Sequence, residues 1–350
     1  MKAITFREPG RVAFETVPDP EINAPTDILV RTKLTAICGS DLHVYLGRET
    51  GNTPGTPMGH EFLGEIVDVG HDVTKFRRGD TIVSPFTTSC GTCFYCKSGL
   101  TCRCTLGQLF GWVDNGEGLP GAQAELVRVP MADATAVSIP EDVDEESALF
   151  VGDILATGLF CAEMAEVRPG RVVAVIGCGP VGLSAVIGAL ELGAERVFAF
   201  DLLPERLALA ARFGATPVRA LGETAKMSVE EATDGRGADA VLEVVGSPEA
   251  TRLALDLVRP GGILSAVGVH TERRFAFSPG EAYDKNLTYR AGRCPARVYM
   301  DRLLDLVRKN KYDLGAMVSH RLKLEDGVRG YELFEKKLDG CTKVVLTPPP

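Results

Sequence analysis

The stretch RVVAVIGCGPVG, residues 171–182, decides how the second half of this 350-residue chain folds. A valine-rich run leads directly into a G-x-G-x-x-G turn, a pattern typical of a buried parallel strand that opens a helix. The first glycine permits a tight turn, the second lets backbone approach a pyrophosphate, and the third lets helix and strand pack closely. The helix N–H groups then face the anion. The residues predicted to line this phosphate site are Gly177, Gly179, Pro180, Val181 and Gly182.

Strands and helices alternate on the C-terminal side of this turn. Apolar strands are expected at 196–201, 238–246 and 263–269, and helices at 180–193, 204–214 and 248–262. This order predicts an α/β domain whose parallel sheet is covered on both faces. Residues 172–190 carry no charge and are nominally long enough to span a bilayer. Because Gly-Cys-Gly-Pro would break a spanning helix, we expect a strand, a turn and a buried helix there.

A carboxylate at the end of the next strand bears on the choice of dinucleotide. Asp201 lies nineteen residues after Gly182, near the spacing expected for a carboxylate that binds the adenosine ribose. Such a group accepts hydrogen bonds from ribose hydroxyls and repels a 2′-phosphate, so it predicts NAD over NADP. Arg206, five residues on, could weaken this discrimination. The alternative role for Asp201 is a plain helix N-cap before Pro204.

The first part of the chain has a different pattern of apolar residues. Up to about residue 129, short apolar stretches are separated by Gly and Pro, which predicts an antiparallel β domain with irregular loops. Residues 147–167 are apolar, rich in Ala and preceded by three acidic residues, so they predict a helix. A further helix is expected at 295–310 and a strand near 343–346.

Composition excludes several classes of protein. Asp and Glu number 47 against 38 Lys and Arg, giving a net charge of −9, so binding to a nucleic-acid backbone is not expected. Arg7 and Glu8 interrupt the N-terminal stretch before the apolar segment of a secretory signal can form. We therefore expect a soluble, cytoplasmic protein without a membrane partner. Its ten cysteines then favour thiols and metal ligands over disulfides.

Two groups of residues have the chemistry of metal ligands. The spacing Cys90-x2-Cys93-x2-Cys96-x7-Cys104 predicts a tetrahedral four-thiolate zinc site, which leaves no open position and is therefore structural. Cys102 could compete as the fourth ligand of this site. A nucleic-acid-binding finger is the rival interpretation, but the loop carries only two basic residues.

The second group is dispersed along the chain. Cys38, His60 and Asp153 could offer sulfur, nitrogen and oxygen ligands to a catalytic zinc that keeps one position open. Their spacing alone does not select these three residues.

In combination, these features resemble the zinc-dependent medium-chain alcohol dehydrogenase family over nearly the whole chain. The most specific element is GHEFLG at 59–64, followed by Gly70 and Val73. Along the chain, CGSDLH at 38–43, this element, the four-cysteine lobe and the glycine-rich turn occur in the same order as in the family. The stretch GDILATG at 152–158 resembles the formaldehyde-dehydrogenase-related branch and its broad-range bacterial alcohol dehydrogenase neighbours.

This resemblance implies a division into domains that the residue pattern alone does not give. A GroES-like catalytic domain would cover 1–154, with the structural zinc lobe at about 88–106. A Rossmann NAD-binding domain would cover 155–287, and 288–350 would return to complete the catalytic domain. The active site would then lie in the cleft between the domains. The resemblance also implies two zinc ions per chain, NAD and a homotetramer.

The resemblance also implies roles for particular residues. Cys38 and His60 match the catalytic zinc ligands, and the third ligand falls on Asp153. Glu61 matches a residue that approaches the metal in some relatives, and its alternative role is a carboxylate behind the ligands. The expected proton path runs from Ser40 through the nicotinamide ribose to His43. The resemblance further places Phe86 in the substrate pocket and Val245, Gly268 and Arg206 at the cofactor.

The predicted activity is reversible, NAD-linked oxidation of primary or secondary alcohols to aldehydes or ketones. A formaldehyde- or aldehyde-dehydrogenase-related enzyme, or a polyol dehydrogenase of the same family, is the alternative. A non-catalytic zinc or nucleotide-binding protein is a third class, and the open Cys38, His60 and Asp153 set argues against it.

Overall fold

A computed structural model describes residues 1–220 and 222–349 of the chain. The chain divides into two compact units, Met1–Asp153 with Pro295–Pro350, and Ile154–Cys294. Each unit has its own sheet and its own buried apolar core. We describe each unit by itself.

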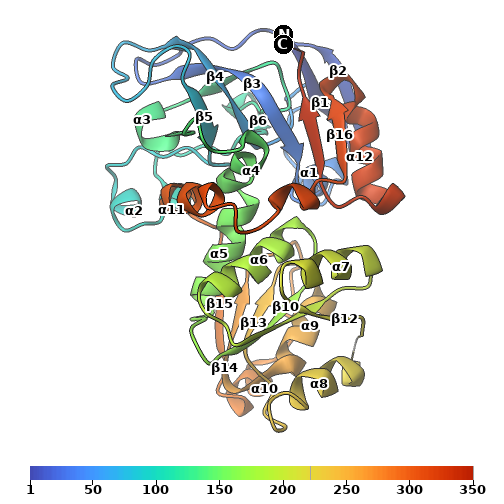
Figure 1. Ribbon diagram of the computed structural model, residues 1–350. Helices are drawn as coiled ribbons and strands as arrows, with labels where there is room; N and C mark the ends of the chain where they lie inside the picture. Colours follow the sequence, from blue (N-terminus) through green and yellow to red (C-terminus); the bar gives the residue numbers. More distant parts are fainter. Residues whose placement is uncertain (221, 350) are drawn as a thin grey trace. The chain divides into compact units, whose positions relative to one another are not determined.

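The second unit contains a six-stranded parallel sheet in the order β12-β11-β10-β13-β14-β15 (Figure 1). Its elements are α5 (Ile154–Met164), β10 (Val172–Ile176), α6 (Pro180–Glu191), β11 (Arg196–Phe200), α7 (Pro204–Arg212), β12 (Thr216–Val218), α8 (Gly222–Glu230), β13 (Ala238–Glu243), α9 (Pro248–Leu257), β14 (Val258–Ala266), α10 (Pro279–Asp284) and β15 (Thr288–Ala291). Strands β10 and β13 are buried along their whole length, which explains the uniformly apolar sequence of β10 and the apolar residues in the middle of β13.

The strand order reverses between β10 and β13. From β10 the chain passes through β11 to β12 on one side, and then returns to β13 and continues through β14 to β15. Because crossovers between parallel strands are right-handed, the two directions place their helices on opposite faces of the sheet. This doubly wound arrangement confirms the Rossmann-like class. Ligands of such sheets bind at the carboxyl ends of the strands beside the reversal.

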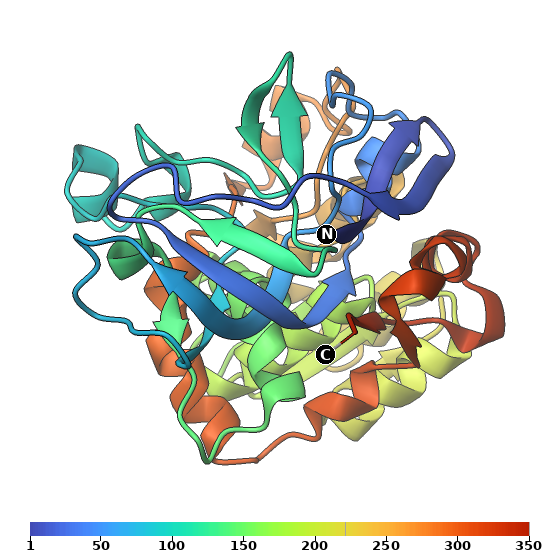
Figure 2. The same cartoon turned by 90° about the horizontal axis from the view of Figure 1, so that it is seen from above.

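The first unit is built on a seven-stranded, mainly antiparallel sheet, in which β3 and β4 run side by side (Figure 2). Its strands are β1 (Lys2–Glu8), β2 (Arg11–Thr16), β3 (Ile28–Ile37), β4 (Glu61–Val69), β5 (Thr81–Ser84), β6 (Trp112–Asp114), β7 (Glu117–Leu119), β8 (Leu126–Val129), β9 (Val137–Ser138), β16 (His320–Lys323) and β17 (Val344–Thr347). Its helices are α1 (Asp41–Tyr45), α2 (Phe94–Lys97), η1 (Thr101–Arg103), α3 (Ala132–Thr135), α4 (Glu145–Leu149), η2 (Phe150–Gly152), α11 (Ala296–Arg308), η3 (Leu314–Met317), η4 (Leu324–Asp326), α12 (Gly327–Lys336) and η5 (Leu338–Gly340).

Three features differ from the sequence-based expectation. The helix expected at 248–262 ends at Leu257, and Val258–Ala266 form the strand β14. The segment expected as one helix at 147–167 is broken, because Asp153 has φ −145° and ψ −81° between η2 and α5. The return to the first unit was expected from residue 288, but Thr288–Ala291 still pairs in parallel with β14 as the edge strand of the six-stranded sheet. The returning segment begins at Pro295, and its strand β17 pairs with β3.

No single helix in 1–220 and 222–349 combines the length and the apolar composition needed to cross a bilayer. One bent pair, Glu145–Gly152 with Ile154–Met164, reaches that standard together, on length and composition alone. The uncharged stretch at 172–190 forms β10, the glycine turn and α6, as predicted.

Candidate functional site

The first unit brings together the dispersed ligand candidates. Cys38 follows directly on β3, His60 directly precedes β4, and Asp153 follows η2. Asp153 Oδ2 lies 3.3 Å from Cys38 Sγ and 3.1 Å from His60 Nε2. All three side chains are at least nine-tenths buried. The fold thus brings three residues that are distant in sequence into one compact set of sulfur, nitrogen and oxygen donors.

This donor set suits a zinc ion. With bonds of about 2.0–2.3 Å to nitrogen, oxygen and sulfur, tetrahedral ligands lie about 3.3–3.6 Å apart, and the separations found here are close to that. One ligand atom from each of Cys38, His60, Glu61 and Asp153 lies within 4.8 Å of the others. Three protein ligands leave a position for substrate, which distinguishes a catalytic site from a structural one.

The electrostatics of the group also call for a cation. Burial raises the pKa of Cys38 to about 11, and the charges of Asp153 and Glu61 act in the same direction. Although burial opposes it, the hydrogen bond and charge of His60 and the charge of Lys343 hold the pKa of Asp153 at about 2. A bound divalent ion reverses the penalty on the thiolate, because metal ligation deprotonates a thiol. The residues therefore fit zinc chemically as well as geometrically.

Asp41 fixes the orientation of His60, one of the candidate ligands. Its Oδ1 lies 2.9 Å from His60 Nδ1, and its Oδ2 accepts a hydrogen bond from the Cys38 backbone N–H at 2.9 Å. A carboxylate only accepts hydrogen bonds, so Nδ1 carries the proton and Nε2 keeps a lone pair for the metal. Burial would lower the pKa of His60, but the charge of Asp41 and its hydrogen bonds raise it well above its usual value.

Glu61 is paired with a buried lysine. Lys343 Nζ, directly before β17, lies 2.6 Å from Glu61 Oε1, and both side chains are fully buried. The second oxygen of Glu61 is buried without a hydrogen-bond partner, and Glu61 is a member of the potential ligand cluster. Burial raises the pKa of Glu61, and Lys343 opposes that rise. The geometry thus allows Glu61 either to stand behind the ligands or to offer them one oxygen.

Two further predicted residues lie beside these ligands, and a third follows on the next helix. Ser40 Oγ is 3.2 Å from His60 Nε2, which places its hydroxyl at the ligand atoms. His43 lies one turn further along α1 with Nδ1 buried and unpaired, and burial lowers its pKa. The Phe86 ring packs edge-on against His60 at 6.3 Å between centroids. Ser40 and Phe86 therefore directly adjoin the ligand set.

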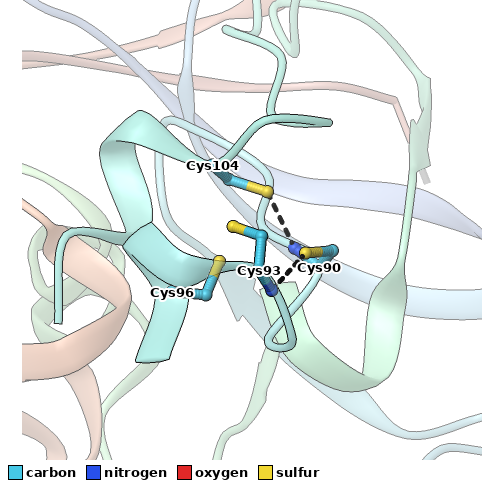
Figure 3. Close-up of side chains that lie close together, drawn as sticks. All are labelled: Cys90, Cys93, Cys96 and Cys104. Atoms are coloured by element: carbon cyan, nitrogen blue, oxygen red, sulfur yellow. Dashed lines mark hydrogen bonds between the residues drawn. The ribbon is translucent and has the colours of Figure 1, made fainter. Parts of the chain in front are cut away.

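Four cysteines form a second cluster in the first unit. Figure 3 shows Cys90, Cys93, Cys96 and Cys104 gathered around one point, and one sulfur from each lies within 4.8 Å of the others. None of these four forms a disulfide. Backbone N–H groups reach two of the sulfurs, since Cys90 N donates to Cys104 Sγ at 3.2 Å and Cys93 N donates to Cys90 Sγ at 3.3 Å. Cys104, and not Cys102, completes the group, which has the composition of a closed structural zinc site.

In the second unit, the predicted cofactor residues meet at one edge of the sheet. The glycine turn follows β10, Asp201 follows β11, Val245 follows β13 and Gly268 follows β14, so all lie at carboxyl ends of neighbouring strands. A Cβ on Gly182 would approach Gly177 O to 1.7 Å, so only glycine permits this packing. Gly179 caps α6 and Pro180 begins it, with Val181 next. The edge is the one at which a doubly wound sheet binds nucleotides.

Asp201 is tied into this edge by its own hydrogen bonds. Its Oδ2 accepts from Cys178 N at 2.8 Å, and its Oδ1 accepts from Leu203 N at 2.9 Å. Leu203, and not Asp201, is the N-cap of α7, so the plain N-cap alternative is wrong. Arg206 Nη1 lies 3.8 Å from Asp201 Oδ2, and its Nε is buried without a partner. A cation therefore stands directly beside the carboxylate expected at the ribose.

Sequence reasoning missed two partners of the ligand group. Lys343 and Asp41 contact the ligand group, and neither was assigned a role. Asp41 lies inside the quoted CGSDLH motif, so its position was a signal. A lysine opening an otherwise apolar strand was the signal for Lys343, because a buried lysine needs a charged partner.

Comparison with known proteins places this site in a family. Residues 24–141 match the family described as alcohol dehydrogenase GroES-like domain, and residues 180–309 match zinc-binding dehydrogenase. Zinc-type alcohol dehydrogenase B of Aspergillus flavus is 46% identical over 342 residues, covering 95% of this chain and 78% of that protein. The chain therefore belongs to the zinc-dependent medium-chain alcohol dehydrogenase family.

Two solved structures show the extent of the likeness. Alcohol dehydrogenase TADH from Thermus sp. ATN1 superposes with a TM-score of 0.93 at 41% identity, with all of both chains covered. A zinc-binding dehydrogenase from Sinorhizobium meliloti 1021, solved with NADP, has a TM-score of 0.84 at 27% identity, with 99% of each chain covered. The GroES-like and Rossmann-like fold expected from the resemblance is thereby confirmed.

Proposed function

We propose that this chain is an NAD-dependent alcohol dehydrogenase that oxidises a primary or secondary alcohol reversibly to the aldehyde or ketone. The observation that carries the proposal is the buried Cys38, His60 and Asp153 donor set with the Ser40 hydroxyl beside it. A binding protein has no use for a three-ligand metal site with an open position. The relatives named above support the same class of reaction.

The protein residues divide the work of such a reaction. When bound, zinc acts as a Lewis acid that lowers the pKa of a hydroxyl group, and nicotinamide accepts a hydride. Ser40 accepts the proton of the substrate hydroxyl, because a serine hydroxyl both accepts and donates. His43 passes the proton to solvent; its lowered pKa keeps the imidazole neutral and able to accept near neutral pH. The Phe86 ring lies edge-on to His60 and would give the substrate an apolar wall.

We assign one catalytic and one structural zinc to each chain. Cys38, His60 and Asp153 would hold the first, with Glu61 and Lys343 behind them. Cys90, Cys93, Cys96 and Cys104 would hold the second. The preference for NAD rests on Asp201, which repels a 2′-phosphate, and Arg206 limits that preference because it offers the phosphate a cation. The homotetramer is supported by the family resemblance of a chain of this length.

The decisive experiment is a panel of primary, secondary, aromatic and polyol alcohols, each with NAD and with NADP, followed by the absorbance of reduced nicotinamide. We expect turnover with simple alcohols and a preference for NAD. Cys38→Ser is expected to abolish turnover and remove one zinc per chain while the four-cysteine zinc stays. Full activity in Cys38→Ser with one zinc fewer would refute the catalytic assignment. Light scattering of the purified protein tests the tetramer.

A further inference from the structure

A buried glutamine connects the ligand group to the returning C-terminal segment. Gln123 precedes β8 and is fully buried. Its Nε2 donates to Asp41 Oδ2 at 3.3 Å and to the Ala36 carbonyl at 3.2 Å. Its Oε1 accepts from the hydroxyl of Tyr331, on α12, at 2.9 Å. Asp41 in turn holds His60, so four side chains form one continuous path that ends at a ligand.

The chemistry of the partners leaves this path only one arrangement of donors. The Asp41 carboxylate and the Ala36 carbonyl can only accept, so the amide NH2 of Gln123 must face them. Its oxygen then faces Tyr331, which must donate. Burial, followed by the charge of Asp41, raises the pKa of Tyr331 well above its usual value, so this hydroxyl stays protonated.

Gln123 is also held by hydrogen bonds of its backbone and by close packing against Gly59, the residue before His60. Its N–H donates to Met58 O at 2.8 Å, and its carbonyl accepts from Ile4 N at 2.8 Å. Gly59 has φ +87°, and a Cβ there would come within 2.4 Å of Gln123 Cγ. The glutamine side chain thus lies directly on the backbone that carries His60, which a larger residue at 59 would displace.

We propose that Gln123 and Tyr331 are positioning residues for the zinc ligand His60, acting through Asp41. Gln123 and the Cys38 N–H hold one oxygen of Asp41, which leaves the other aimed at His60 Nδ1. Tyr331 fixes the amide, so α12 of the returning segment helps to set the geometry of the metal site. This inference rests on the proposed function, because it takes His60 as a zinc ligand.

The test measures zinc retention without reference to turnover. Gln123→Met keeps the length of the side chain but removes both donors and the acceptor; Tyr331→Phe removes a single oxygen atom. Groups behind a metal ligand typically change metal affinity by about 10–100-fold, so we expect Gln123→Met to release the catalytic zinc faster by about that factor. We expect about 3–10-fold for Tyr331→Phe, which acts through one more hydrogen bond. Release is followed with a chromogenic zinc chelator.

Two controls separate positioning from simple packing. Tyr45, whose ring lies 5.3 Å from that of Tyr331, shares its apolar cluster but is outside the path, so Tyr45→Phe should release zinc like the parent. The four-cysteine zinc of each variant is the internal reference and should be released at the parental rate. Cobalt substitution gives a second readout, because the visible spectrum of thiolate-bound cobalt should shift in Gln123→Met and Tyr331→Phe only.

The outcomes are distinguishable. Selective loss of the catalytic metal in both variants supports the inference. A lower melting temperature with parental release of the catalytic zinc would overturn it and leave Gln123 and Tyr331 as core residues. If Gln123→Met does not fold, Tyr331→Phe decides alone. A parent protein that is inactive on alcohols and binds only the four-cysteine zinc would overturn the proposed function, and this inference with it.

Discussion

Replacing Lys343 by Met should destabilise the first unit strongly, and more so as the pH rises. The lysine and its partner Glu61 are both fully buried and 2.6 Å apart, so the change leaves a carboxylate without compensation in the interior. Removing one partner of a buried pair costs about 3–5 kcal/mol. In a unit of roughly 200 residues, about 1 kcal/mol corresponds to about 2–4 °C, so we expect melting to fall by about 6–20 °C.

The pH dependence has a definite sign. Burial already raises the pKa of Glu61, and without the opposing Lys343 that pKa rises further. A carboxyl whose pKa is higher in the folded than in the unfolded state loses stability as pH rises, by at most about 1.4 kcal/mol per pH unit between the two values. The deficit of Lys343→Met relative to the parent should therefore be smallest near the pKa of an unfolded Glu, about 4.3, and grow towards neutral pH.

Thermal unfolding of metal-stripped protein, at several pH values and one protein concentration, measures this effect. Lys336→Met is the matched control, since Lys336 pairs with Glu332 on the exposed face of α12 and its loss should leave stability almost unchanged at every pH. Adding Glu61→Gln to Lys343→Met should recover much of the loss, because the buried charge is gone. Equal melting of Lys343→Met and Lys336→Met at every pH would refute the reasoning.

Three further changes test other parts of the molecule. Cys90→Ser should lower the melting temperature and remove one zinc per chain, because a closed thiolate site contributes to folding; unchanged melting and metal content would show that the cluster is not a zinc site. Asp201→Ala should erode the preference for NAD over NADP, measured as the ratio of kcat/KM values, and an unchanged ratio would limit Asp201 to its backbone contacts. The hydrogen bond between His270 Nε2 and Glu243 Oε2, at 2.9 Å, raises the pKa of His270. The stability that this pair contributes is fully present below the pKa of an unfolded histidine, about 6.5, and is lost as the pH rises through the higher pKa of His270 in the folded protein. His270→Asn should therefore flatten the plot of melting temperature against pH above about 6.5. A plot identical to the parent's would contradict this.

The sequence predicted well those features that depend on residues close together in the chain. The glycine turn, its strand and its helix lie within twenty residues, and the four cysteines within fifteen, so spacing carries their geometry. Short elements with few apolar residues, such as β12 and β15, were not foreseen, because their pairing depends on the sheet that receives them. The break at Asp153 was missed because the segment as a whole is apolar and contains several Ala and Leu residues, although Gly152 and Asp153 are themselves weak helix formers.

The metal site shows the same limit. Cys38, His60 and Asp153 could be named only through a family resemblance, since they are 22 and 93 residues apart in sequence. Their supporting groups are further away still: Lys343 meets Glu61 across 282 residues, and Tyr331 meets Gln123 across 208. A lone lysine or glutamine in an apolar segment does not reveal its partner, because long-range pairing is decided by the fold.

The 282-residue separation between Glu61 and Lys343 has a consequence for the order of assembly. Closing a loop of that length is entropically costlier than joining β3 to β4, which brings Cys38 and His60 together early. Until β17 docks, Glu61 lacks the charge of Lys343, so burying its carboxylate is unfavourable and it stays hydrated. We therefore expect water to leave the surroundings of Glu61 late in folding, when the C-terminal strand docks and closes them off from solvent.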